Sequence, residues 1–157
     1  MKVVINSCYG GFSLSNRAVK MVCDIKGIPC FFYRREDLMA GPHIRISDDE
    51  AFADTSIMGV SSYQVDSPEL IPDQSNWREM SMDERKASNE AYDAIGTPDR
   101  NIDRDDPALI ATVEALGEAA SGRCASLKII EIPDGVDWQV EEYDGREHIA
   151  ERHRTWP

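Results

Sequence analysis

Two adjacent glycines near the start of the chain have the type and position to bind a small anion. Gly10 and Gly11 come directly after the β-branched run at residues 3–5 and just before a helical pattern. Glycines at such a turn allow a sharp bend and leave backbone N–H groups uncovered, a geometry that binds anions. The flanking aromatic rings could stack on a base, although such rings are more often part of the core. The residues expected to contact a ligand here are Tyr9, Gly10, Gly11, Phe12 and Ser13.

Three arginines complete the candidate site. Arg123 lies between a predicted helix and a predicted strand, Arg104 precedes two aspartates, and Arg154 lies near the C-terminus. A guanidinium can form two parallel hydrogen bonds with a phosphate or a carboxylate, so each arginine is a candidate ligand contact. Structural interpretations stay open: Arg123 could pair with a carboxylate and Arg104 with the two aspartates. The tail that carries Arg154 could be solvated, form a lid or reach a neighbouring subunit.

Motifs for catalysis or metal binding are missing from the sequence. There is no HExxH or GxSxG pattern, and the spacing of His148 and His153 does not place two metal ligands on one helix face. Residues 153–155 form one H-x-T motif, whereas two-histidine phosphoesterases require two. We therefore expect no catalytic residue, no metal and no cofactor.

The charge balance and the cysteines restrict partners and location. The 29 Asp and Glu residues and 17 Lys and Arg residues give a net charge of −12. This charge repels nucleic acid polymers but allows a small anion in a cleft lined by a few arginines. No apolar run is long enough to cross a membrane, no leader precedes Val3, and the four cysteines form no CxxC pair. We expect a cytoplasmic protein without a disulfide framework or a zinc ribbon.

The stretch from Asp105 to Pro133 has the clearest local signals. Asp106 can accept hydrogen bonds from the N–H groups of a first helical turn, and Pro107 favours the first helical position. Gly122 is expected to end this helix in the left-handed conformation, and residues 126–132 predict a strand. Apolar residues at helical spacing predict one buried face on the helix, formed by Leu109, Ile110, Val113, Leu116 and Ala120.

The remaining elements predict an α+β fold. Residues 1–7 predict a first, central strand, and residues 16–26 predict a helix that Gly27 ends. Residues 66–101 predict an insertion with one helix, Ser81 to Ile95. The residues that could pack it on the body are Trp77, Met80, Ala87, Ala91 and Ile95. Further strands are predicted at residues 29–35, 42–47, 55–65, 136–143 and 146–151, the last two as a hairpin around Asp144-Gly145.

We thus expect a single domain, residues 1–157, with a helical insertion at about residues 66–101. Its fold class is α+β, with a mainly antiparallel sheet, an N-terminal strand-loop-helix unit and a long helix in the C-terminal half.

Two blocks of the sequence resemble a known family. The opening NSCYGGFSLS and the C-terminal stretch that begins RDDPALIATVEALGEAASGRC and ends HRTW resemble the first-described phage anti-Thoeris family. The resemblance implies a homo-oligomer of interlocked dimers in the cytoplasm of an infected bacterium. It also implies that the protein sequesters cyclic ADP-ribose isomers without cleaving them, and related members could hold cyclic oligonucleotides. The acidic segment at residues 66–101 departs from the pattern.

The leading hypothesis is therefore a protein that sequesters a signalling nucleotide and is not an enzyme. One alternative is an enzyme acting on ADP-ribose-like or cyclic nucleotide phosphates, and a second is a protein inhibitor of a host defence factor. Two arginine contacts and one or two base stacks contribute roughly 4 to 12 kcal/mol before ordering costs, whereas nanomolar binding needs about 12 kcal/mol. Enclosure of the ligand at a subunit interface would supply the difference.

Overall fold

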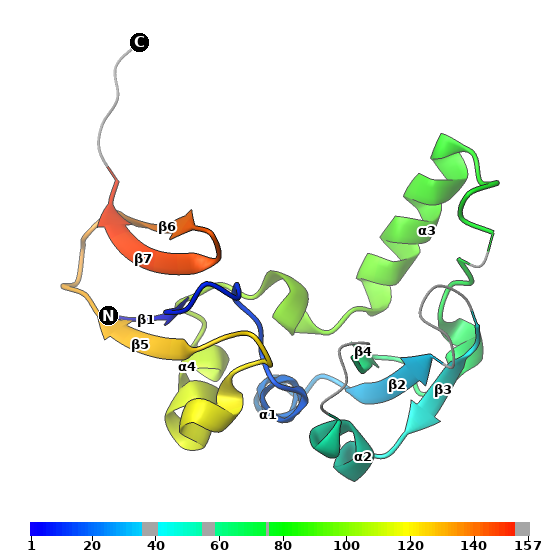
Figure 1. The fold of residues 1–157 in the computed structure, drawn as a ribbon, viewed down its shortest axis with the longest axis horizontal. Helices are drawn as coiled ribbons and strands as arrows, with labels where there is room; N and C mark the ends of the chain where they lie inside the picture. Colours follow the sequence, from blue (N-terminus) through cyan, green and yellow to red (C-terminus); the bar gives the residue numbers. More distant parts are fainter. Residues whose placement is uncertain (36–40, 55–58, 75, 153–157) are drawn as a thin grey trace. The chain divides into compact units, whose positions relative to one another are not determined.

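The computed structural model describes residues 1–35, 41–54, 59–74 and 76–152, and its fold is α+β (Figure 1). The described strands form three small antiparallel sheets. The chain divides into two compact units: unit 1 contains residues 1–22 and 101–157, and unit 2 contains residues 23–100. The segment predicted as an insertion, residues 66–101, therefore lies almost wholly in unit 2, where it joins the three strands that precede it.

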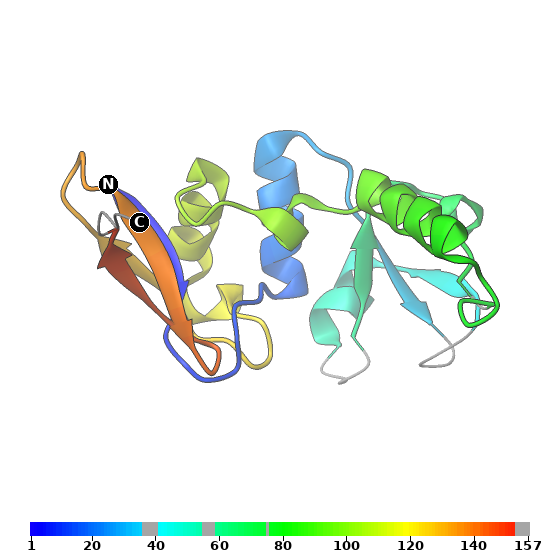
Figure 2. The same cartoon turned by 90° about the horizontal axis from the view of Figure 1, so that it is seen from above.

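Unit 1 is built from both ends of the chain. Strand β1 (Lys2–Asn6) pairs with β5 (Leu127–Glu131), in antiparallel register from Lys2↔Glu131 to Asn6↔Leu127. Strands β6 (Trp138–Tyr143) and β7 (Arg146–Glu151) form the predicted hairpin. Figure 2 shows this hairpin beside β1, and β7 is the strand in contact with it. Among the described strands β1 has one ladder partner, so the prediction of a central strand is wrong.

The helix in the C-terminal half begins as predicted. The Asp106 side chain accepts hydrogen bonds from the N–H groups of Ala108 and Leu109, and α4 (Pro107–Leu116) follows. It ends earlier than expected, because Gly117 has a φ of 57° and a 3-10 turn, η3 (Gly117–Ala120), continues the chain. Gly117 therefore supplies the left-handed residue that was predicted at Gly122.

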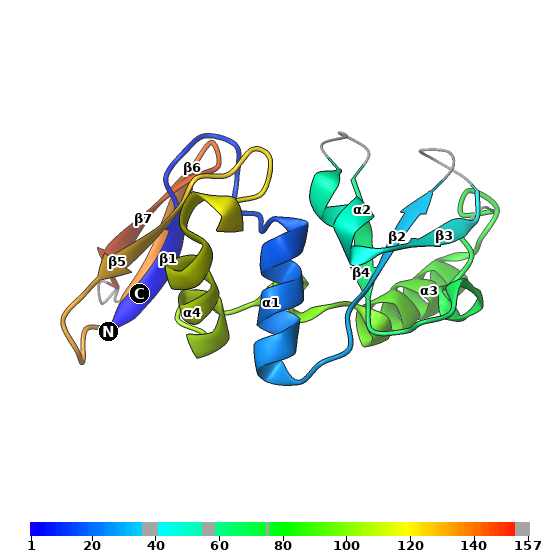
Figure 3. The ribbon, with the colours of Figure 1, turned by 90° about the horizontal axis from the view of Figure 1, so that it is seen from below.

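The buried face of this helix forms the centre of unit 1. Figure 3 shows α4 beside β1 and β5, and the N-terminal part of α1 (Asn16–Lys26) packs on the same cluster. Gly27, with a φ of 67°, ends α1 as predicted. The buried members of the cluster are Val4, Ala18, Leu109, Val113, Ala120 and Leu127.

Unit 2 contains a three-stranded sheet with the order β3-β2-β4. These strands are β2 (Phe31–Arg35), β3 (His43–Ile46) and β4 (Ser61–Tyr63), each inside a range predicted as a strand. The rest of unit 2 consists of α2 (Asp48–Ala53), η1 (Pro68–Leu70), α3 (Met82–Ile95) and η2 (Pro98–Asn101), the last of which ends at the first residue of the returning unit 1 segment. The capping box of α3 at Ser81 and Glu84 is present as predicted, whereas α2 and its own capping box were not predicted.

Side chains of β2 alternate between the two faces of this sheet. Phe32 lies 6.0 Å from the Phe52 ring of α2, while Tyr33 lies 5.8 Å from Tyr63, measured between ring centroids. Tyr63 in turn contacts Tyr92 of α3 at 6.0 Å. Helix α3 therefore packs through Tyr92 and through Ile95, which was predicted to pack. The prediction is wrong for Ala87 and Ala91, because both are exposed.

Among the described residues, no helix combines the length and the apolar character needed to cross a bilayer.

Candidate functional site

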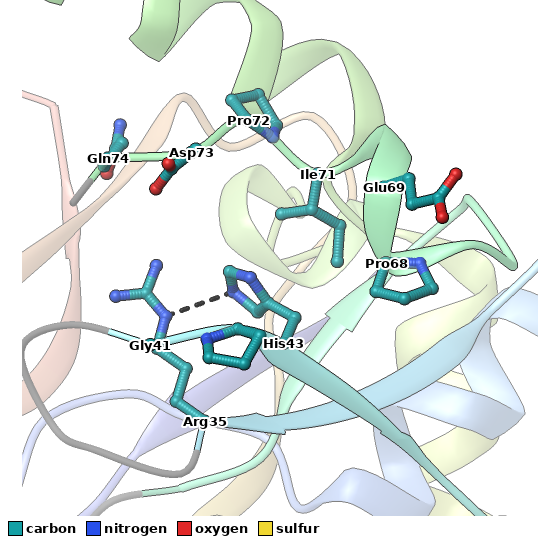
Figure 4. A pocket seen from close by; sticks show the side chains of 10 residues that line it. Arg35, Gly41, His43, Pro68, Glu69, Ile71, Pro72, Asp73 and Gln74 are labelled. Atoms are coloured by element: carbon teal, nitrogen blue, oxygen red, sulfur yellow. Dashed lines mark hydrogen bonds between the residues drawn. The ribbon is translucent and has the colours of Figure 1, made fainter.

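A pocket of about 490 Å³ lies within unit 2, on the α3 side of the sheet (Figure 4). One wall comes from the facing ends of β2 and β3, and the other from the segment that contains η1 and leads toward α3. Its volume falls in the range typical of sites for small molecules. The lining residues are Arg35, Gly41, Pro42, His43, Pro68, Glu69, Ile71, Pro72, Asp73 and Gln74.

Arg35 is held in place by hydrogen bonds to neutral partners. It lies directly opposite His43 in the β2–β3 ladder, and its Nε donates to His43 Nε2 at 3.2 Å. Its Nη2 donates to the Tyr92 hydroxyl at 3.1 Å, and that hydroxyl donates to the Pro72 carbonyl at 2.8 Å. The guanidinium is thus fixed between the strand, helix α3 and the opposite wall of the pocket.

The His43 ring is suited to accept a hydrogen bond from Arg35. Burial lowers the pKa of His43, and the positive charge of Arg35 lowers it further, against an opposing effect of Asp73. The imidazole is therefore neutral at pH 7, with Nε2 as the acceptor of the Arg35 proton. Because this nitrogen is already occupied, His43 is poorly placed to act as a general base.

The walls of the pocket combine apolar surface with a few polar groups. Pro68, Ile71 and Pro72 supply most of the apolar lining of the wall opposite the strands. Gln74 lies at the end of this wall, where its Nε2 donates to Ser88 of α3 at 3.0 Å. Apolar walls with a small number of fixed polar groups are typical of sites that bind a small organic molecule.

The residues predicted from the glycine loop lie in unit 1, at a point where three turns meet. A side chain at Gly10 would collide with the backbone carbonyl of Cys124, and one at Gly122 would collide with Ser13. The Gly122 N–H donates to the Ser13 carbonyl at 2.9 Å. Gly145, in the turn of the β6–β7 hairpin, packs against this loop in the same way. The glycines here allow close approach of backbone segments.

Asn6 ties these turns together and was not predicted as important. It is fully buried, and its Nδ2 donates to the carbonyls of Cys8 and Gly145, each at 2.7 Å. Its Oδ1 accepts a hydrogen bond from the Ser126 N–H at 2.8 Å. The sequence signal for this role was an asparagine at the end of a predicted strand, since a buried side-chain amide requires several hydrogen-bond partners.

Arg104 has a structural partner, but not the one predicted. Its Nη2 donates to Glu147 at 2.6 Å, whereas the structural alternative left open by the sequence was pairing with the aspartates that follow it. Its guanidinium lies over the Phe12 ring, 3.2 Å from the centroid, and Glu147 also accepts the Asn6 N–H at 2.8 Å. Burial lowers the pKa of Arg104, and the Glu147 carboxylate opposes that shift.

The other predicted ligand residues differ in their exposure. Tyr9 is 61% exposed, with the Arg146 guanidinium 5.9 Å from its ring centroid, and Arg123 is exposed beside Cys124. Arg154 lies outside the described residues. The structure thus brings Tyr9 to Ser13 beside the Arg123 turn and places Arg104 on Phe12, while their role in ligand binding stays a prediction.

Sequence reasoning treated the arginines of the small sheet as a solvated face and missed the pocket. Arg34 and Arg45 are exposed, but Arg35 is half-buried. The signal was the alternation of Phe31, Tyr33 and Arg35, which places a guanidinium on the same face as a partly buried and a buried ring. Its pairing with His43 depends on strand register, which the sequence does not reveal by itself.

Comparison with known protein families, curated proteins and solved structures finds no match. Within the described ranges, no group of three or more His, Cys, Asp or Glu side chains is arranged to hold a metal ion.

Proposed function

We propose that this protein binds and sequesters a small signalling nucleotide of the cyclic ADP-ribose type without cleaving it. The observation that supports the proposal is the Arg35 guanidinium, held by His43 and Tyr92 in a pocket of about 490 Å³. In this proposal the protein acts in the cytoplasm of an infected bacterium, where removal of the signal would block an anti-phage response. The resemblance of the two terminal blocks to the anti-Thoeris family is the second support.

The chemistry of the pocket favours binding over catalysis. Arg35 can donate a charge-assisted hydrogen bond to a phosphate, since its hydrogen-bond partners His43 and Tyr92 are uncharged. His43 is the imidazole of the pocket, and its Nε2 already accepts from Arg35. The Tyr92 hydroxyl is likewise occupied, because it accepts from Arg35 and donates to Pro72. These contacts position groups and leave none of the three poised to transfer a proton.

The energy available from one pocket supports an oligomer in this proposal. A charge-assisted hydrogen bond contributes about 1.5 to 3 kcal/mol, whereas nanomolar sequestration needs about 12 kcal/mol. A second set of contacts, from a neighbouring subunit, would close the difference by enclosing the ligand. We therefore include a homo-oligomer built from dimers in the proposal.

Calorimetric titration with cyclic ADP-ribose isomers tests the proposal. Arg35→Ala should lower the affinity at least tenfold, because it removes the cation of the pocket. Arg34→Ala is the matched control: it removes the same charge from the adjacent position of β2, whose side chain is exposed on the opposite face. Ligand recovered after denaturation of the complex should be chemically intact.

The same titration separates the pocket from the predicted loop site. If Arg123→Ala abolishes binding and Arg35→Ala leaves it unchanged, the ligand binds in unit 1 and the pocket is not the site. Recovery of a hydrolysed ligand would instead support the alternative of an enzyme acting on nucleotide phosphates.

A further inference from the structure

The charged groups that line the pocket of unit 2 are unequal in number. Arg35 supplies one positive charge, Glu69 and Asp73 supply two carboxylates, and His43 is neutral because burial lowers its pKa. A ligand with negative charge along its whole length would be repelled by these carboxylates wherever it lies away from Arg35. The lining instead fits a ligand that carries its negative charge at one end and hydrogen-bond donors at the other.

Asp73 is the carboxylate that shares the space in front of Arg35. Its charge acts electrostatically on both His43 and Tyr92, the two side chains that hold the Arg35 guanidinium. Figure 4 shows the Asp73 carboxylate turned toward the side of the pocket where Arg35 lies, whereas the Glu69 carboxylate points away. Asp73 therefore places carboxylate oxygens in the same pocket as a cationic donor.

We infer that the pocket recognises a ribose with its attached phosphate, with the phosphate on Arg35 and the sugar hydroxyls on the Asp73 carboxylate. An ionised carboxylate has two acceptor oxygens and no donor, and it pairs well with the hydroxyls of a ribose. The carbon atoms of the sugar or base then lie against Ile71 and the neighbouring prolines. This inference rests on the proposed function and names the part of the nucleotide that the pocket reads.

The experiment measures binding of cyclic ADP-ribose and of two analogues, each of which lacks the 2′-hydroxyl group of one of its riboses. For the wild-type chain, one of the two deletions should weaken binding about ten- to a hundredfold, the loss expected for a hydrogen bond to a charged group. Asp73→Asn should weaken binding of cyclic ADP-ribose by a similar factor. It should also remove the difference in affinity between cyclic ADP-ribose and the weaker-binding analogue. Asp83→Asn is the matched control, since it removes an equal charge at the exposed start of α3, and it should change neither.

Two results would overturn the assignment while keeping the proposed function. Equal affinity of the wild-type chain for all three ligands would show that no ribose hydroxyl is read. Tighter binding of every ligand after Asp73→Asn would show that this carboxylate only repels the phosphate. Absence of binding by the wild-type chain to any of the three would remove the proposed function itself, and the ribose assignment with it.

Discussion

Arg104 and Arg35 are both half-buried arginines with aromatic neighbours, but their partners differ in charge. Arg104 forms an ion pair with Glu147, whose side chain is only 6% exposed. Arg35 donates to an imidazole and a phenol, neither of which carries a negative charge. A buried charge without its partner is costly, so the first arrangement serves the fold of unit 1, whereas the second suits a ligand that brings the opposite charge.

Breaking the Arg104–Glu147 ion pair of unit 1 should cause a large loss of stability. Glu147→Ala leaves the Arg104 guanidinium buried without its carboxylate and removes the acceptor for the Asn6 N–H. We expect a loss of about 3 to 5 kcal/mol in the free energy of unfolding, measured by urea denaturation. Glu151→Ala, at an exposed position of the same strand, should change it by less than about 0.5 kcal/mol. Similar values for the two variants would contradict the structural role of the pair.

The lowered pKa of His43 should make the stability of unit 2 depend on pH. Burial, followed by the charge of Arg35, lowers the pKa of His43 from its ordinary value of 6.5. The unfolded chain therefore binds this proton more readily, and stability is lost as the pH falls from about 7 through 6.5 toward the lower folded-state pKa. His43→Gln should flatten the fall in melting temperature between pH 7 and pH 5. An unchanged slope of melting temperature against pH would mean that other titratable groups cause the fall.

At the scale of elements, the turns of unit 1 are held by backbone contacts that only glycine permits. Gly10 has no space for a side chain because of Cys124, and Gly122 has none because of Ser13. The glycine loop, the turn before β5 and the hairpin turn thus form one packed junction. Residues predicted to bind a ligand lie within it, so substitutions there test packing as well as binding.

Gly10→Ala should destabilise this junction. The added methyl group must displace the Cys124 backbone, at a cost of roughly 1 to 3 kcal/mol in the free energy of unfolding. Gly27→Ala is the control, because its side chain would meet open space and only the left-handed φ of 67° is unfavourable. Amide hydrogen exchange separates the two: only Gly10→Ala should speed exchange of the Gly122 N–H. Equal exchange rates in both variants would argue against a packed junction.

The sequence predicted those elements whose signals are local. Asp106 and Pro107 placed the start of α4, Ser81 and Glu84 placed α3, and Asp144-Gly145 placed the hairpin turn, since each acts on its own neighbours. The pocket could not be predicted in this way. It requires the register of β2 against β3 and the approach of the segment after η1, and both are set by tertiary packing.

At the scale of the whole molecule, an unpaired sheet edge favours association with a second copy of the chain. In the described part of unit 1, the β6–β7 hairpin is a two-stranded sheet that contacts β1 through β7. Among the described strands, β6 pairs only with β7, so its other edge has no ladder partner there. A second copy of the chain would cover such an edge, which agrees with the oligomer implied by the family resemblance.

We therefore expect a stable homo-oligomer in dilute solution. Light scattering coupled to gel filtration should give a mass that is a multiple of 17.6 kDa at micromolar concentration. Because the net charge of −12 makes subunits repel one another, dissociation should be easier at low than at moderate ionic strength. A mass of one chain at every salt concentration would contradict this expectation. It would also count against a ligand enclosed between two subunits.

The pairing of β1 with β5 also determines the order in which the chain can fold on the ribosome. The partner of Asn6 is Leu127, so β1 leaves the ribosome long before its ladder can form. At elongation rates of about 5 to 20 residues per second, this apolar strand waits for roughly 6 to 24 seconds. Unit 2 is a continuous segment and is complete during that interval. Nascent chains stalled before β5 would thus display an unpaired apolar strand, a natural target for chaperones.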